Sequence, residues 1–152
     1  MPREKPAGDF RALSEFRYQI RRFLAFSKKA AWAAGVDSQQ HQLMLAMRGL
    51  PPGTKPTIDV LAERLQIRHH SAVELVDRSM RRGLVERQRD GADRRRVTVR
   101  LTPRGEKILN ELALHHSKEL RAAGPELVRV LRRIIADSGN SGRRGTKPGR
   151  GR

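Results

Sequence analysis

The sequence predicts a mainly α-helical fold that carries one small β-hairpin. Apolar residues recur at steps of three and four in several stretches between residues 10 and 134, which is the spacing of helices with one buried face. Residues 97–101 instead alternate apolar and polar side chains, as a half-buried strand does. A loop containing Gly91 separates this strand from another expected to begin at Leu84. Helices therefore dominate, and one hairpin interrupts them.

Two helices are predicted in the first third of the chain. The first begins at Phe10, where the apolar repeat starts, and is expected to end near Gly35, because glycine is common just after a helix. The second is expected to run from an N-cap at Asp37 or Ser38 to Arg48, where a Pro-Pro-Gly segment soon follows. It is expected to bury Leu43, Met47 and either Leu45 or Ala46.

The middle of the chain predicts a helix-turn-helix. Thr57 can cap a short helix from Ile58 to Leu65, and residues 66–68 suit a tight turn. A helix from His69 to Arg82 follows and stops at a glycine. Two short helices joined by so short a turn indicate this motif.

A hairpin follows these two helices directly. One strand begins at Leu84, the other spans residues 97–101, and residues 88–96 between them are rich in turn-forming and basic residues. A hairpin in this place is a wing. The sequence therefore predicts a winged helix-turn-helix.

Two more helices and two polar ends complete the prediction. Thr102-Pro103 suits the N-cap and first position of a helix, and a separate last helix is expected after Gly124-Pro125, extending to residue 137. Residues 1–9 and 138–152 are rich in proline, glycine or charged residues and are expected to be disordered, the second segment as a basic tail.

Charge indicates the class of partner. The chain has 33 Lys and Arg residues against 16 Asp and Glu residues, a net charge of +17. Removing the five basic residues among the last ten still leaves +12 (17 − 5), so the folded part is itself basic. Such a field favours phosphate polyanions. We favour nucleic acid over an anionic membrane surface, because no strongly apolar amphipathic segment stands out.

Several function classes are excluded by the sequence. The absence of cysteine removes disulfides and thiolate metal sites. No Gly-x-Ser-x-Gly, glycine-rich phosphate loop or metal-spaced acid cluster is present, so an enzyme or a cofactor is not expected. No apolar run approaches the ~20 residues of a membrane span, and a cytoplasmic protein is expected. The histidines outside the helix-turn-helix, His41, His115 and His116, are interpreted as structural or surface residues rather than metal ligands.

One face of the second helix of the motif carries the candidates for reading DNA bases. Ser71, Glu74 and Arg78 recur at steps of three and four, and His69 and His70 lie at the helix start. In a major groove these side chains can reach base edges, and Glu74 can accept a hydrogen bond from cytosine N4. The alternative is an ordinary solvated face on which Arg78 pairs with Glu74.

The predicted wing carries three consecutive arginines after Asp93, namely Arg94, Arg95 and Arg96. Because like charges at a turn repel one another unless an anion is present, this run favours contact with DNA over a flexible charged tip. Further candidates, for phosphate contacts that position a protein without reading sequence, are Arg64, Arg68 and Arg89. Surface charge explains each of these last three equally well.

Several stretches resemble the MarR family of bacterial winged-helix transcription regulators, over roughly residues 10–137. The most specific is the wing signature, in which Asp93-Arg94-Arg95 is followed by a strand and then by Leu101-Thr102. The sequence departs from the family at Ser79, where members commonly carry a larger apolar residue. The matching stretches are residues 40–45, 61–65, 76–78, 82–87, 93–97 and 101–105.

The resemblance implies a homodimer in which helices within residues 10–36 and 103–137 flank a DNA-binding lobe at about residues 55–102. It implies a pseudo-palindromic operator and, usually, repression that a small ligand relieves. It also implies that Asp93 holds Arg95, which enters the minor groove. Apolar residues on more than one side of the last helix fit a partner surface. The residues expected at the dimer interface are Phe10, Leu13, Phe16, Ile20, Leu127, Leu131 and Ile134.

The sequence therefore predicts a dimeric, sequence-specific regulator of transcription, with residues 69–82 in the major groove and the wing, residues 89–96, in the minor groove of double-stranded DNA. Two alternatives stay open. A non-specific architectural binder is favoured by the charge and the basic tail. A ligand-binding or protein-interaction module without DNA binding is disfavoured by the intact wing arginines. Phe26, Trp32 and Met47 could line an effector pocket, although core packing is the better explanation for each.

Overall fold

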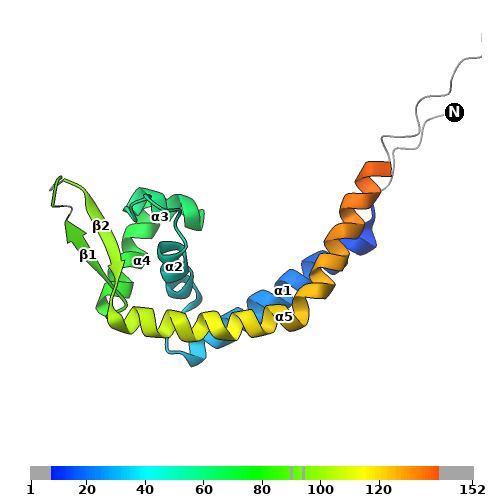
Figure 1. The fold of residues 1–152 in the computed structure, drawn as a ribbon, viewed down its shortest axis with the longest axis horizontal. Coiled ribbons are helices and arrows are strands. Elements are labelled where there is room, and N and C mark those ends of the chain that lie inside the picture. Colours follow the sequence, from blue (N-terminus) through cyan, green and yellow to red (C-terminus); the bar gives the residue numbers. More distant parts are fainter. Residues whose placement is uncertain (1–7, 90, 94, 141–152) are drawn as a thin grey trace, which may run out of the picture. The chain divides into compact units, whose positions relative to one another are not determined.

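The computed structural model describes residues 8–89, 91–93 and 95–140 (Figure 1). Most of them are helical and the two strands form one hairpin, so the predicted fold class is confirmed. Residues 27–116 form one compact unit, here called the winged-helix unit, and the outer parts of the first and last helices form a second, the terminal-helix unit. In chain order the elements are α1 (Phe10–Ala33), α2 (Ser38–Arg48), α3 (Ile58–Leu65), α4 (His69–Arg81), β1 (Val85–Arg89), β2 (Val97–Leu101) and α5 (Pro103–Asn140).

The winged-helix unit consists of three short helices, a hairpin and the adjoining parts of α1 and α5. Helices α2, α3 and α4 pack against one another, and α4 leads directly into the hairpin. The two strands are antiparallel, with Val85 opposite Leu101. The segment before α3 joins the hairpin, because Thr57 forms a β-bridge with Thr98. This is the winged helix-turn-helix that the sequence predicts.

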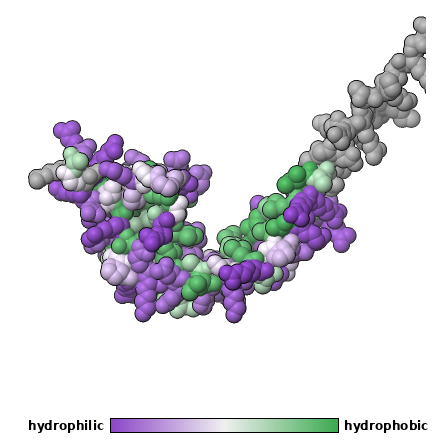
Figure 2. All heavy atoms as spheres, viewed as in Figure 1, coloured by the Kyte–Doolittle hydropathy of each residue, from purple (hydrophilic) through white to green (hydrophobic). Residues whose placement is uncertain are grey.

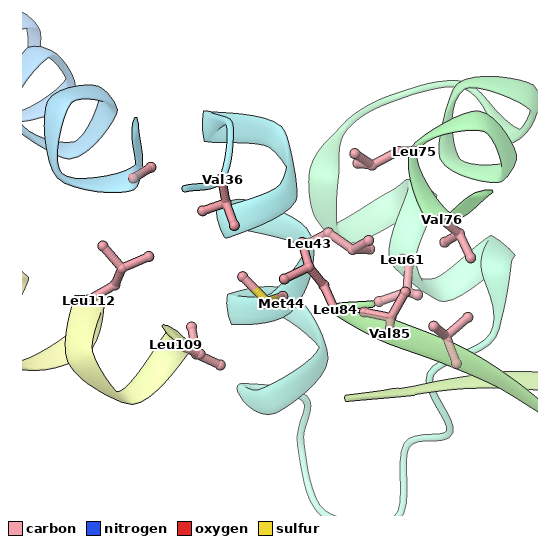
Figure 3. Close-up of a cluster of buried hydrophobic side chains, with 12 residues drawn as sticks. Val36, Leu43, Met44, Leu61, Leu75, Val76, Leu84, Val85, Leu109 and Leu112 are labelled. Atoms are coloured by element: carbon pink, nitrogen blue, oxygen red, sulfur yellow. The ribbon is translucent and has the colours of Figure 1, made fainter. Parts of the chain in front are cut away.

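One hydrophobic core holds the winged-helix unit together (Figure 3). On α2 the buried face differs from the prediction, because Met44 is fully buried whereas Leu45 is 45% exposed and Met47 is only partly buried. Gln40 and His41 are buried on the same face, so this face is centred nearer the start of α2 than expected. The core side chains labelled in Figure 3 are Val36, Leu43, Met44, Leu61, Leu75, Val76, Leu84, Val85, Leu109 and Leu112.

The hairpin and α5 meet at a close backbone contact. A Cβ atom added to Gly105 would lie 2.1 Å from the carbonyl oxygen of Leu84, so only glycine fits there. The Thr102 hydroxyl donates to the carbonyl of Gly83 at 2.6 Å and accepts the Gly105 amide at 3.0 Å. Thr102 therefore caps α5, as predicted, and also fixes the turn between α4 and β1.

The prediction of two separate C-terminal helices is wrong. Helix α5 continues through Pro125 and extends to Asn140, three residues beyond the predicted end. Pro125 removes one N–H donor, but Pro125 and Arg121 are both exposed, so water can bind the carbonyl that loses its partner. The neighbouring alanines, Ala122 and Ala123, favour helix and offset part of the cost.

In the terminal-helix unit, the start of α1 contacts the C-terminal part of α5. Asp9 caps α1, since its Oδ1 accepts the Ala12 amide at 2.9 Å, and its Oδ2 accepts Arg133 Nε from α5 at 2.7 Å. The predicted disorder of residues 1–9 is therefore wrong for Asp9, which the N-cap pattern could have identified. Residues 1–7 and the predicted tail from residue 141 onward lie outside the described part of the chain.

Two histidines meet inside the winged-helix unit. His41 of α2 is 2% exposed, and its ring centroid lies 4.8 Å from that of His116 in α5. His116 Nδ1 donates to the Leu112 carbonyl at 2.7 Å, and its Nε2 lies 2.8 Å from the Ser27 hydroxyl of α1. Burial and, to a lesser degree, the charge of His116 lower the pKa of His41 from 6.5 to about 4.

Replacing Gly105 by alanine should destabilise the protein. The new methyl group would force apart the backbones of α5 and Leu84, and overpacking of this kind costs about 1–3 kcal/mol of unfolding free energy. Gly91→Ala in the wing loop is the control: an added Cβ there meets nothing within 4 Å, so the unfolding free energy should change by less than about 0.5 kcal/mol. Denaturant unfolding measures both. Equal effects of the two substitutions would contradict the close contact.

Acid should destabilise the protein through His41. In the folded chain His41 stays neutral down to about pH 4, whereas in the unfolded chain it takes up a proton near pH 6.5. Its contribution is complete above pH 6.5 and is lost as the pH falls towards 4. Over this range the unfolding free energy of the wild type should fall by about 3 kcal/mol more than that of His41→Asn. Denaturant titrations at several pH values test this, and parallel curves would exclude the effect.

Candidate nucleic-acid interface

Helix α4 has a buried side and a polar side. Ala72, Leu75, Val76 and Ser79 pack into the core, and the Ser79 hydroxyl donates to the Leu75 carbonyl at 2.7 Å. This hydrogen bond satisfies a polar group at a position where an apolar one is usual. On the other side, Glu74 is exposed.

The start of α4 is tied to α3. His69 Nδ1 lies 2.7 Å from Asp59 Oδ1, and both side chains are exposed. Ser71 is partly buried and His70 is exposed. The structure thus brings His70, Ser71 and Glu74 to one accessible surface, with His69 at its edge held by a carboxylate that the sequence analysis did not consider.

Arg78 lies on α4 but its guanidinium binds α2. Its Nη2 donates to Gln39 Oε1 at 2.9 Å and lies 3.4 Å from Asp37 Oδ2. The ion pair with Glu74 considered from the sequence is replaced by this one with Asp37. The partner is distant in sequence, so no local spacing could have indicated it.

The tip of the wing is organised by Asp93. Its Oδ1 accepts the main-chain amide of Arg95 at 3.0 Å, and its carbonyl accepts the amide of Arg96 at 3.0 Å. The resemblance implied that Asp93 holds Arg95, and these contacts act on the main chain of the turn. Arg89, Arg95 and Arg96 are exposed, and Arg94 lies outside the described residues.

Ion pairs attach the wing to α4. Arg87 of β1 contacts Asp77 of α4 at 2.8 Å, and Arg100 of β2 contacts Glu86 of β1 at 2.6 Å. Glu86 and Arg100 are directly opposite each other in the hairpin, so a correct register would have predicted the second pair. The Arg87–Asp77 pair orients the hairpin relative to α4, and the Arg100–Glu86 pair joins the two strands.

A cleft of about 550 Å³ lies between the wing and the start of α3. Three cations line it, Lys55, Arg95 and Arg96, with the acid Asp59 on its α3 side. Lys55 was not selected from the sequence, because it lies in an extended segment without a motif. Of the three predicted phosphate contacts, Arg89 lies at the end of β1, and Arg64 and Arg68 are exposed elsewhere on the same unit.

The residues predicted at a dimer interface lie in the terminal-helix unit. Figure 2 shows hydrophobic side chains gathered along its helices. On α1, Phe10 is 75% exposed and Leu13 is 44% exposed. On α5, Val128 is 45% exposed and Ile135 is 68% exposed. Partly buried in the single chain are Phe16, Ile20, Leu127, Leu131 and Ile134.

The described residues hold no group of three or more histidine, aspartate or glutamate side chains placed to bind a metal ion. None of the helices found there is both long and apolar enough to cross a membrane.

The helix-turn-helix, the hairpin and its basic tip define a winged-helix protein. Residues 34–96 match the model of the MarR family. This match covers less than half of the chain, and over these residues the resemblance stated from the sequence is confirmed. The HTH-type transcriptional regulator YsmB of Bacillus subtilis (strain 168) is 37% identical over 65 residues, which are 43% of this chain and 44% of that protein. The chain thus matches less than half of the length of this relative, which is named as a regulator and not as an enzyme.

Solved structures show the same fold. AbsC, a MarR family transcriptional regulator from Streptomyces coelicolor, is 18% identical with a TM-score of 0.68, covering 91% of this chain and 98% of AbsC. A variant of S. aureus MepR bound to an oligodeoxyribonucleotide is 17% identical with a TM-score of 0.59, covering 83% and 94%. The M. tuberculosis regulator MosR, solved in complex with DNA, is 21% identical with a TM-score of 0.55, covering 83% and 91%.

Proposed function

We propose that this protein regulates transcription by binding a specific sequence of double-stranded DNA as a homodimer. The observation that carries the proposal is the juxtaposition, on one compact unit, of an accessible polar face of α4 and a wing whose exposed arginines lie beside it. The net charge of +17 adds long-range attraction to DNA. MepR and MosR, which share the fold, were solved with DNA.

In this proposal α4 is the recognition helix and lies in the major groove. His69, His70, Ser71 and Glu74 are placed to approach base edges, and Glu74 would prefer a cytosine amino group. Arg78 was predicted to join them. Its guanidinium, however, is bound to α2.

The wing enters the adjacent minor groove with Arg95, and phosphate contacts come from the cations around it. Because Asp93 fixes the main chain of the turn, less conformational entropy is lost when Arg95 enters the groove. Narrow minor grooves attract arginine. Lys55 joins the proposed phosphate contacts through the cleft that it lines with Arg96. The predicted phosphate contacts are Arg64, Arg68 and Arg89, and Arg94 remains a prediction for the wing.

Dimerisation is proposed through the terminal-helix unit. Phe10 and Ile135 are 75% and 68% exposed in the single chain, and contiguous exposed apolar side chains of this kind indicate a partner surface. A second copy of the chain would cover this surface. Two recognition helices about one DNA turn apart would then bind a pseudo-palindromic operator.

Repression that a small ligand relieves is the proposed mode of regulation. A pocket of about 350 Å³ beside α4 is the proposed ligand site. It is lined by Trp32 and Gln40, by Arg78 of α4 and by Arg82, the C-cap of α4. An occupant of this pocket would contact the end of the recognition helix directly. No cofactor is needed for this mechanism.

Selection from random duplex DNA at physiological salt tests the proposed function. We expect an inverted repeat whose half-sites are centred about 10 base pairs apart. Such a repeat would support both sequence readout and dimerisation. Recovery of DNA without enrichment, together with binding that disappears as salt rises, would reject the regulator and favour a non-specific binder.

Replacing Arg95 by alanine should weaken binding to the selected operator at least about tenfold, the cost of about one well-made DNA contact. Because Arg95 is exposed and only its main chain is bonded to Asp93, the fold should stay intact. Fluorescence anisotropy measures the affinity and circular dichroism the fold. An unchanged operator affinity would remove Arg95 from the interface.

A further inference from the structure

Two arginines connect the end of α4 to the junction between α1 and α2, defined as residues 34–37. Arg78 reaches Gln39 and Asp37, as described above. Four residues later, Arg82 Nη2 donates to the main-chain carbonyl of Gly35. The end of α4 and its cap are thus joined to the α1–α2 junction and to the start of α2.

The groups that the arginines contact are themselves fixed. Asp37 Oδ1 accepts the Gln40 amide at 2.8 Å, and Gln40 Oε1 accepts the Asp37 amide at 3.1 Å, so Asp37 caps α2 in a capping box. Gly35 has φ of +82°, a conformation that glycine adopts easily. Arg78 therefore uses the one carboxylate oxygen of Asp37 that the cap leaves available.

The guanidinium of Arg78 contacts this junction and is only partly exposed to solvent. Its Nε is buried without a hydrogen-bond partner among the described residues, and the whole side chain is only 40% exposed. To contact a base, Arg78 would have to leave both Asp37 and Gln39. Arg78 and Arg82 thus both bind groups in or next to the α1–α2 junction.

We infer that Arg78 and Arg82 are positioning residues, which fix the orientation of α4 in the DNA groove and do not themselves read bases. The inference rests on the proposed function. Base readout requires side chains to be held within about 0.5 Å of the productive geometry. Loosening the end of α4 should therefore reduce affinity for the operator, while non-specific affinity depends mainly on the number of cations near phosphates.

Asp37→Asn separates positioning from contact, because the residue does not lie on α4 at all. Asparagine is as good an N-cap as aspartate, so the cap of α2 remains and only the charge facing Arg78 is lost. We expect operator affinity to fall about three- to fivefold, as for a half-exposed ion pair. Affinity for a shuffled duplex of equal length should not fall, because the variant is more basic.

Arg78→Gln is compared with Arg81→Gln, which removes the same charge from an exposed position of the same helix. Arg78→Gln should weaken operator binding about tenfold, more than Arg81→Gln, while both lower affinity for the shuffled duplex about equally. The double variant Asp37→Asn/Arg78→Gln should bind no more weakly than Arg78→Gln alone. Anisotropy titrations at one salt concentration give all these affinities, and thermal unfolding checks each fold. If Arg78→Gln fails to fold, the operator affinity of Asp37→Asn tests the inference: a three- to fivefold loss supports it, and wild-type affinity overturns it.

The outcomes are distinct. A positioning role predicts that repeating the selection with Arg78→Gln lowers the preference at all positions of the half-site. Loss of preference at one base position, with Asp37→Asn at wild-type affinity, would overturn the inference and make Arg78 a base-reading residue. A wild-type protein that prefers no sequence would instead reject the proposed function, and the inference with it.

Discussion

The winged-helix unit depends on the contact between the first turn of α5 and the carbonyl of Leu84. Four elements meet there, since α4 ends at Arg81 and β2 at Leu101, while β1 begins at Val85 and α5 at Pro103. Gly105 allows the two backbones to touch, and the Thr102 hydroxyl bonds to both sides of the contact. In the proposed function, α4 and the wing act together on DNA only if the angle between them is fixed, and this contact contributes to fixing it from the side of the core.

Four aspartates of this basic chain hold basic residues or their main chain in place. Asp93 fixes the wing turn, Asp77 holds the root of the hairpin, Asp37 holds Arg78, and Asp59 holds His69. Each pair is at least partly exposed and contributes at most about 1 kcal/mol. These contacts therefore position basic groups more than they stabilise the fold. A basic side chain that is already held in place loses less conformational entropy when it binds a phosphate.

The fold was predictable because its signals are local. Thr57, Thr102 and the alternation of residues 97–101 each specify one element, and together they define the wing. The errors arose where tertiary context decides. Pro125 lies on an exposed part of α5, where the Arg121 carbonyl that loses its partner is open to solvent. The side chain of Arg78 points to Asp37, 41 positions earlier (78 − 37), and no pattern of spacing within α4 contains that partner. The spacing of Arg78 from Glu74 predicted that it reads bases, whereas in the folded chain its guanidinium contacts Asp37.

Trp32 gives this protein a built-in optical probe. It is the single tryptophan of the chain, it is 78% exposed, and it lines the same pocket as Arg78 and Arg82. Tryptophan fluorescence of this protein therefore comes from the pocket where the end of α4 meets the α1–α2 junction. A ligand that displaces water from this pocket should shift the wavelength or change the intensity of this fluorescence. Binding of a ligand to the pocket can therefore be followed in unlabelled protein.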